Sequence, residues 1–167
     1  MPSTREIPPV GRLGLELLEV LFSVHLLRNP APEADDYLSQ MRNKKIVALL
    51  VNDIIIRIGK FREKSNRNLG FLKVAKLLGK TSAAGHAAAA ASAIEEFMNS
   101  SIRLGNYRNL AVAHLSKHGT AELDPLVELY HLVGLAIRIV DILDGEKNEY
   151  RVGPVDLRKE VIDDEDV

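Results

Sequence analysis

The sequence predicts an all-α fold, a bundle of four to five main helices. Apolar residues recur at helical spacing over several long segments, and the stretch TSAAGHAAAAASAIEEF contains a run of alanine, the residue with the highest helix propensity. The β-branched run IVALLVNDIII lies inside a longer helical pattern, so we predict no strand. The 167 residues suit one domain with a sizeable core.

The first helix is expected over residues 12–28, after an irregular arm of residues 1–11 that is rich in proline. Two proline residues within the sequence NPAP end this helix. Its apolar residues at helical spacing form one stripe, which consists of Leu15, Leu18, Phe22 and Leu26.

The second helix is expected over residues 33–63, where Asp35 and Asp36 suit the positive end of the helix dipole. A polar loop follows at residues 64–68, and then a short helix over residues 69–78 that ends at Gly79. The apolar residues that the second helix is expected to bury are Leu38, Met41, Val47, Leu50, Ile54, Ile58 and Phe61.

The alanine-rich segment is expected to be helical to about residue 104, perturbed at Gly105 and Asn106, and helical again to Gly119. Its small side chains let another helix approach closely, which predicts a contact within the bundle or between subunits. The last helix has clear limits, because Asp124 can cap it, Pro125 suits its first turn and Gly145 can stop it. The helical bundle therefore spans residues 12–145, and residues 146–167 form a polar, acidic tail.

Composition excludes several classes of protein. The chain has no cysteine, so disulfides and cysteine-bound metals are excluded, and no apolar run approaches the roughly 20 residues that cross a bilayer. We therefore expect a cytoplasmic protein with no membrane contact. The formal net charge is −1, but cations cluster between Arg57 and Lys80 while the last residues are acidic. This cluster is either a local footprint for a polyanion or an ordinary solvated helix face.

Several charged residues have an ordinary structural interpretation. Asp53 and Arg57 lie four residues apart in the second helix, which predicts an ion pair within that helix. His86 is expected near a helix start, and Glu95 and Glu96 are expected at the surface.

The segment RNLAVAH, residues 108–114, places an arginine, an amide and a histidine in an oily region. In one interpretation Arg108 extends to solvent and His114 lies at the edge of the core. In the other, the two side chains handle phosphate. On an ideal helix they point about 120° apart, so they converge only if the arginine bends round or a second chain completes the site.

This segment resembles the motif of the HEPN superfamily (higher eukaryotes and prokaryotes nucleotide-binding), in particular its abortive-infection and toxin branch. The family motif is an arginine, a polar residue, and a histidine after four to six intervening residues. Here these are Arg108, Asn109 and His114, with one more long helix expected after them. The basic loop followed by FLKVAKLL is also similar, and the resemblance spans about residues 15–143.

The resemblance implies a metal-independent endoribonuclease that cleaves RNA by attack of the 2′-hydroxyl. Two copies of the motif would meet across a two-fold axis and form one composite cleft in a homodimer. Arg108, His114 and Asn109 would be the catalytic residues, and no cofactor is implied. A cognate antitoxin is a further expected partner. The side chains that we expect to contact RNA beside the motif are Arg103, Tyr107, Lys117 and His118.

Other interpretations stay open. Ser116 stands where one toxin branch has a tyrosine that its antitoxin modifies, so that regulation is not expected here. Many family members have lost catalysis, so the alternative is a non-catalytic module that binds nucleic acid, a nucleotide or a partner protein. A third interpretation is a purely structural bundle that oligomerises through its alanine-rich face. His114 and His118 lie one turn apart, but no carboxylate joins them before a glycine break, so we expect no metal site.

Overall fold

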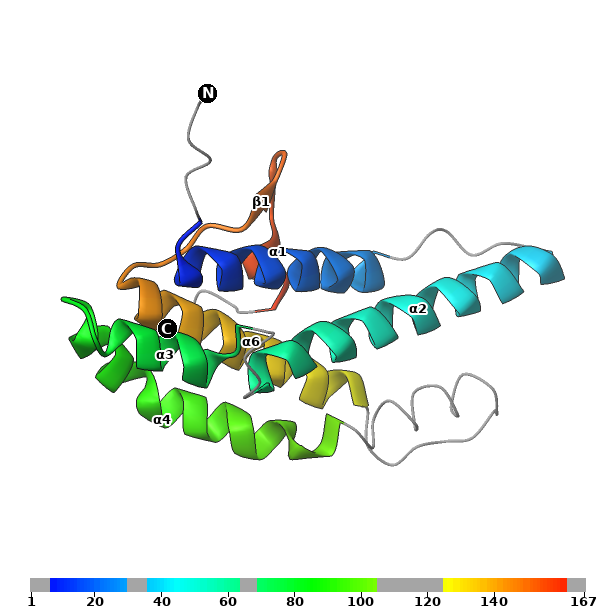
Figure 1. Cartoon of the computed structure of the whole chain (residues 1–167). Coiled ribbons are helices and arrows are strands. Elements are labelled where there is room, and N and C mark those ends of the chain that lie inside the picture. The colour runs from blue at the N-terminus through cyan, green and yellow to red at the C-terminus, as the bar shows by residue number, and fades with distance from the viewer. Residues whose placement is uncertain (1–6, 30–35, 64–68, 105–124, 162–167) are drawn as a thin grey trace, which may run out of the picture.

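The computed structural model describes residues 7–29, 36–63, 69–104 and 125–161. These residues form an all-α bundle, as the sequence predicted, with one small hairpin added (Figure 1). The elements in chain order are α1 (Pro9–Arg28), α2 (Tyr37–Arg62), α3 (Phe71–Leu78), α4 (Ala84–Ser100), the 3₁₀ turn η1 (Ser101–Arg103), α6 (Pro125–Asp144), β1 (Arg151–Val152), β2 (Val155–Asp156) and the 3₁₀ turn η2 (Leu157–Glu160).

Helix α6 lies at the centre of the bundle. It packs against α1, α2 and α4, while α3 packs mainly on α4. A helix that is apolar over a broad face can cover several neighbours at once. The buried residues of α6 are Leu129, Leu132, Val133, Leu135, Ala136, Ile137, Ile139, Val140 and Leu143.

Three phenylalanine rings join α2, α3 and α4. The ring of Phe71 stacks on Phe61 with centroids 4.8 Å apart and meets Phe97 edge-on at 5.0 Å. Each such pair contributes about 0.5–1.5 kcal/mol beyond the area that it buries. Gly70 permits this packing, because a Cβ there would collide with the backbone oxygen of Glu63.

Helix α1 differs from the prediction in its start and in its buried face. It begins at Pro9, where the fixed φ of proline suits the first turn, so the irregular arm is shorter than expected. Most of the predicted stripe faces outward, with Leu15 50% exposed and Phe22 and Leu26 each 40% exposed, while Leu18 is partly buried against the core. The helix carries two apolar rows, and the row with more members faces the core. That row consists of Val10, Leu13, Leu17, Val20, Leu21 and Val24.

Helix α2 begins at Tyr37 because Asp36 caps it, accepting a hydrogen bond from the Ser39 amide at 2.9 Å. This hydrogen bonding lowers the pKa of Asp36. Burial is confirmed for Ile54 and Ile58 and for Phe61 at the end of the helix.

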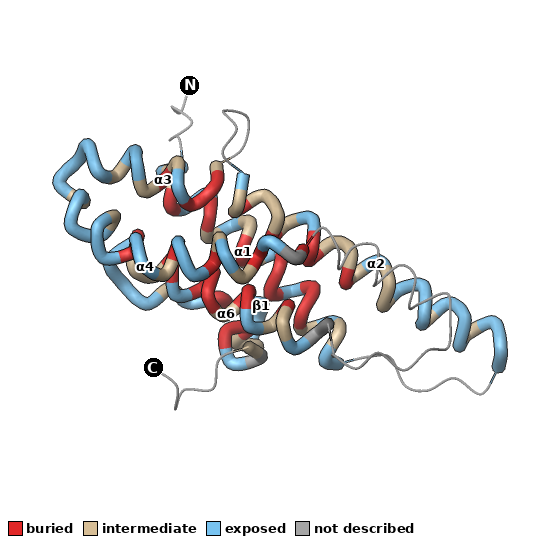
Figure 2. Tube along the Cα trace, turned by 90° about the horizontal axis from the view of Figure 1, so that it is seen from below, coloured by how far each residue is buried: buried red, intermediate tan, exposed pale blue. Residues whose placement is uncertain are grey.

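The first half of α2 projects from the bundle, and we call residues 37–50 the arm (Figures 1 and 2). The predictions that Leu38 and Met41 are buried were wrong, because these side chains are 78% and 48% exposed. Val47 and Leu50 are half-buried. The apolar period continues into the arm, where Val47 packs against the core while the other large side chains are exposed. These exposed side chains are Tyr37, Leu38, Met41, Ile46 and Leu49.

The middle helices follow the prediction closely. Helix α3 ends at Leu78 with Gly79 at its C-cap, and His86 lies in the first turn of α4. The alanine-rich helix ends at Ser100 and continues as η1 to Arg103. Ala90 is fully buried in this helix, whereas most of the other alanines of the run are exposed.

The C-terminal part corrects the prediction that the chain has no strand. Helix α6 stops at Gly145 as expected, with φ of +81°, and the chain then forms a hairpin in which Arg151 pairs with Asp156 and Val152 with Val155. The Gly153-Pro154 dipeptide at its turn is the local signal that the sequence prediction did not use. Among residues 146–161, those that pack against the bundle as buried side chains are Tyr150, Leu157 and Arg158.

Candidate functional site

The candidate catalytic residues Arg108, Asn109 and His114 lie outside the described residues. The same holds for the candidate RNA contacts Tyr107, Lys117 and His118. The backbone of Arg103 belongs to η1, and its side chain is outside the described part. Residues 105–124, which include the motif, lie between two ends that the structure does describe, residue 104 and residue 125. These two ends define where the motif is attached, and we call residues 105–124 the segment.

The end that precedes the segment is fixed to the core. Ser101 is fully buried, and Leu104 is 5% exposed. The Arg62 guanidinium, on the last residue of α2, donates to the Ser101 carbonyl oxygen at 3.3 Å. The Ser101 hydroxyl donates to the Met98 carbonyl oxygen at 3.2 Å. The last turn of α4 and η1 are thus joined to α2, and the segment leaves from a well-packed position.

The end that follows the segment is also fixed. The Arg28 guanidinium, at the end of α1, lies over the Tyr130 ring at 4.9 Å from the centroid. Such a cation–π contact contributes about 0.5–1 kcal/mol at an exposed position. Leu129 and Leu132 are buried in the first turns of α6. Both ends of the segment therefore meet the bundle through packed helix ends.

A pocket of about 360 Å³ lies between the end of α4 and the start of α6. The Nε2 atom of His131 lies 4.0 Å from Oε1 of Glu96, and both side chains are more than half exposed, so this pair contributes little to stability. This pairing could not be predicted, because Glu96 and His131 lie far apart along the chain. The pocket is lined by Asn99, Ser100, Glu128, His131 and Leu132.

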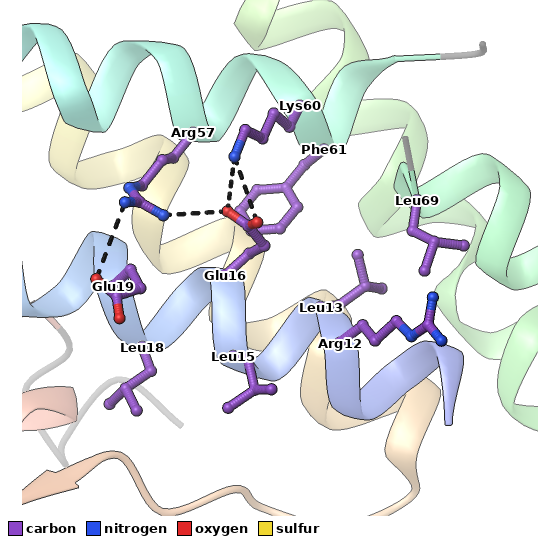
Figure 3. A pocket seen from close by; sticks show the side chains of 10 residues that line it. All are labelled: Arg12, Leu13, Leu15, Glu16, Leu18, Glu19, Arg57, Lys60, Phe61 and Leu69. Atoms are coloured by element: carbon purple, nitrogen blue, oxygen red, sulfur yellow. Dashed lines mark hydrogen bonds and ion pairs between the residues drawn. The ribbon is translucent and has the colours of Figure 1, made fainter. Parts of the chain in front are cut away.

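A second groove, of about 500 Å³, lies between α1 and α2 and holds a network of ion pairs (Figure 3). The expected pair within α2 is confirmed, with Arg57 Nε 3.0 Å from Asp53 Oδ2. Arg57 also lies 3.2 Å from Glu16, which in turn lies 3.1 Å from Lys60. The buried Ser23 hydroxyl donates to Asp53 at 3.0 Å.

The electrostatics of this groove limit what it can bind. Burial would lower the pKa of Arg57, but the hydrogen bond and charge of Asp53, with the charges of Glu16 and Glu19, outweigh it and raise the pKa. Arg57 and Lys60 are the first residues of the cationic stretch for which the sequence left two interpretations open, a footprint for a polyanion and an ordinary solvated helix face. In the structure carboxylates of α1 and α2 engage both, so they hold these helices together and do not face solvent as unpaired charges.

The other histidines of the described part have structural contacts. His25 lies one turn before Asn29, whose amide nitrogen is 3.1 Å from the His25 Nδ1 atom. The ring of His86 packs where a Cβ of Gly145 would stand. Within the described ranges no three His, Cys, Asp or Glu side chains gather as metal ligands would.

The comparisons identify no relative, since no protein-family model, curated protein or solved structure matches the chain. Within the described residues no helix is both long and apolar enough to span a membrane. The class that the described residues define is an all-α helical bundle with one small hairpin.

Proposed function

We propose that the protein is a metal-independent endoribonuclease that acts as a homodimer. The observation that carries the proposal is the RNLAVAH segment, with Arg108, Asn109 and His114 at the spacing of the HEPN motif. Its position supports the proposal, because the segment connects two helix ends that are packed against α2 and α1.

The chemistry uses groups that these side chains supply. One His114 imidazole takes the proton from the RNA 2′-hydroxyl, whose oxygen attacks the adjacent phosphorus. The bond from phosphorus to the 5′-oxygen breaks, and the His114 of the second subunit gives that oxygen a proton. Arg108 holds the phosphate oxygens as negative charge builds, and Asn109 positions the phosphate or the guanidinium. The products are a 2′,3′-cyclic phosphate and a 5′-hydroxyl, so DNA is not cleaved.

The test is RNA cleavage by the purified protein in EDTA. We expect His114→Ala to reduce the cleavage rate by about 10²–10⁴-fold, the range for loss of a general acid or base. His86→Ala is the matched control, because His86 lies in the first turn of α4, far along that helix from η1. It should cleave like the wild type. The rate should also show a bell-shaped dependence on pH around neutrality.

Three results would contradict the proposal. Cleavage that requires a divalent metal would exclude the mechanism, and equal loss in both histidine variants would exclude the role of His114. Absence of cleavage by the wild type, with RNA still bound, would favour the non-catalytic module.

A further inference from the structure

The pocket between α4 and α6 lies beside both points where the segment is attached, and we call it the α4–α6 pocket. Asn99 and Ser100 are the last two residues of α4, just before η1, and Glu128 and His131 lie in the first two turns of α6. These helix ends lie side by side (Figure 1). The volume of about 360 Å³ is within the range of sites for small organic ligands.

The lining of the α4–α6 pocket combines an apolar surface, a ring and hydrogen-bonding groups. Leu132 is 2% exposed and supplies the apolar part, while the imidazole of His131 is exposed. The Asn99 amide and the Ser100 hydroxyl can each donate and accept hydrogen bonds. Proteins recognise unstacked RNA bases in this way, by stacking on aromatic rings that include histidine and by hydrogen bonds to the base edges.

The charge of the pocket disfavours a phosphate group. Glu128 belongs to the lining, and the Glu96 carboxylate lies 4.0 Å from His131 Nε2. No lysine or arginine is among the described residues that line the pocket. A carboxylate has about four acceptor positions, so Glu128 can accept hydrogen bonds from a ligand as well as from the protein. The part of an RNA that fits this pocket is therefore a base, whose edge donates hydrogen bonds.

The acceptors of the pocket should also distinguish between bases. Adenine, cytosine and guanine each carry an exocyclic amino group that donates hydrogen bonds. Uracil has carbonyl oxygens in place of such a group, and these would face the oxygens of a carboxylate. The lining should therefore disfavour uracil.

We infer that the α4–α6 pocket binds one base of the RNA substrate and selects a base with an exocyclic amino group over uracil. The ring of His131 stacks on the face of the base, and Glu128 and Asn99 bind its edge. The inference rests on the proposed function, since it takes RNA as the ligand, and it adds the residues that determine specificity.

The test measures the affinity of the full chain for short 2′-O-methyl oligonucleotides by fluorescence anisotropy. The methyl group blocks the attacking hydroxyl, so binding is measured without cleavage. One oligonucleotide contains only uracil, and three others carry adenine, cytosine or guanine at one central position. We expect the wild type to bind at least one of these three about tenfold more tightly than the uracil oligonucleotide.

Variants of the lining assign this preference to the pocket. Glu128→Gln replaces one acceptor by a donor and should remove most of the preference. His131→Ala should weaken binding of the preferred oligonucleotide by about tenfold, and His131→Phe, which keeps a ring, should restore it. Neither side chain is buried, so the fold should be kept, as circular dichroism can verify. His86→Ala, at the other end of α4, is the control and should bind like the wild type.

Equal affinities of the wild type for all four oligonucleotides, or no binding of any, would overturn the inference. A preference that survives in both Glu128→Gln and His131→Ala would also overturn it, because the base would then be recognised elsewhere. Failure of the proposed function gives a different result. Cleavage of unmodified RNA in EDTA without a base preference would keep the function and exclude the pocket. A preference that depends on Glu128 and His131, without cleavage, would keep the pocket and favour the non-catalytic module.

Discussion

Among single residues, Tyr150 is notable because its side chain is buried while its hydroxyl group forms no hydrogen bond with the described residues. It is 4% exposed, and within the described residues its hydroxyl is the one buried side-chain polar atom that has no hydrogen-bond partner. Burial raises the pKa of Tyr150, and the charge of Asp141 raises it further, against the opposing effect of Arg158. The folded state therefore favours the neutral phenol and gains little from its oxygen.

Replacing Tyr150 by phenylalanine should leave the free energy of unfolding unchanged, or raise it by about 1 kcal/mol, because the unpaired hydroxyl is removed. The pH dependence should also change. An unfolded tyrosine loses its proton near pH 10, while the folded group with its raised pKa keeps it, so wild-type stability should fall as pH rises above about 10. Tyr150→Phe should lack this component.

Urea unfolding at about pH 7 and about pH 11 measures both effects. A variant that loses more than about 1 kcal/mol at neutral pH would show that the hydroxyl does form a stabilising hydrogen bond.

Burial of particular residues could be predicted from the sequence only where one apolar row was available. In the second half of α2 the expected residues Ile54, Ile58 and Phe61 are buried. In α1 two apolar rows have helical spacing, and the prediction named the row with fewer members, whereas the longer row faces the core. The contacts of Glu16 with Arg57 and Lys60 could not be predicted either, because they join two helices.

Among the elements, the C-terminal segment has more structure than its polar sequence suggests. Arg158 is buried, and its Nη1 atom lies 2.6 Å from Asp141 Oδ2 of α6. The backbone N–H of Asn148 donates to the other carboxylate oxygen at 2.9 Å. One carboxylate thus fastens both the start and the end of this segment to the central helix.

Arg158→Ala should destabilise the protein by about 3 kcal/mol, since it leaves the largely buried Asp141 carboxylate without its cation. Arg151→Ala is the matched control in the same segment. Its ion pair with Glu149 is 3.5 Å long and exposed on both sides, so its loss should cost under about 1 kcal/mol. Urea unfolding of the two variants distinguishes them. Equal losses of stability in the two variants would show that burial does not make the Arg158–Asp141 ion pair more important for stability than the exposed pair.

The limits of two helices were predictable because single residues determine them. Gly79 follows α3, and Pro125 and Gly145 bound α6, each by local backbone chemistry. The start of α2 was expected at residue 33, but the helix begins at Tyr37, because Asp36 is its cap and not part of its first turn. The hairpin was missed because strands of two residues are too short to show a period. The exposure of the apolar side chains in the arm depends on where the neighbouring helices end. The sequence of α2 alone contains no information about that position.

In the molecule as a whole, charge is distributed in a way that the net value of −1 does not reveal. Arg57 and Lys60 are held by carboxylates, whereas Lys76 and Lys80 are exposed on and just after α3. Cations that face solvent are the ones available to neutralise phosphate groups. The two lysines therefore remain candidates for contact with a polyanion.

If the protein binds RNA through this face, Lys76→Gln and Lys80→Gln should each reduce the slope of log affinity against log salt by about 1. Lys60→Gln is the control, because its ammonium group is engaged by Glu16 and should not change the slope. Filter binding to a single-stranded RNA over a range of salt concentrations measures this slope for each variant. Slopes that stay unchanged in both lysine variants would place the RNA elsewhere on the molecule.

The fold class was predictable from composition and period, while the relation between distant segments was not. The assignment of Arg108, Asn109 and His114 comes from spacing along the chain and stays a prediction. The pocket beside Asn99 and His131 arises only when α4 and α6 come together.

The contact between His86 and Gly145 has an evolutionary consequence. Because the backbone has φ of +81° and the exposed His86 ring occupies the space of a β-carbon, a side chain at position 145 would be strained and would have to displace that ring. Descendant chains should therefore keep glycine at position 145. Asparagine, which tolerates this backbone conformation better than most residues, should be accepted there more readily where a smaller residue has replaced the ring at position 86.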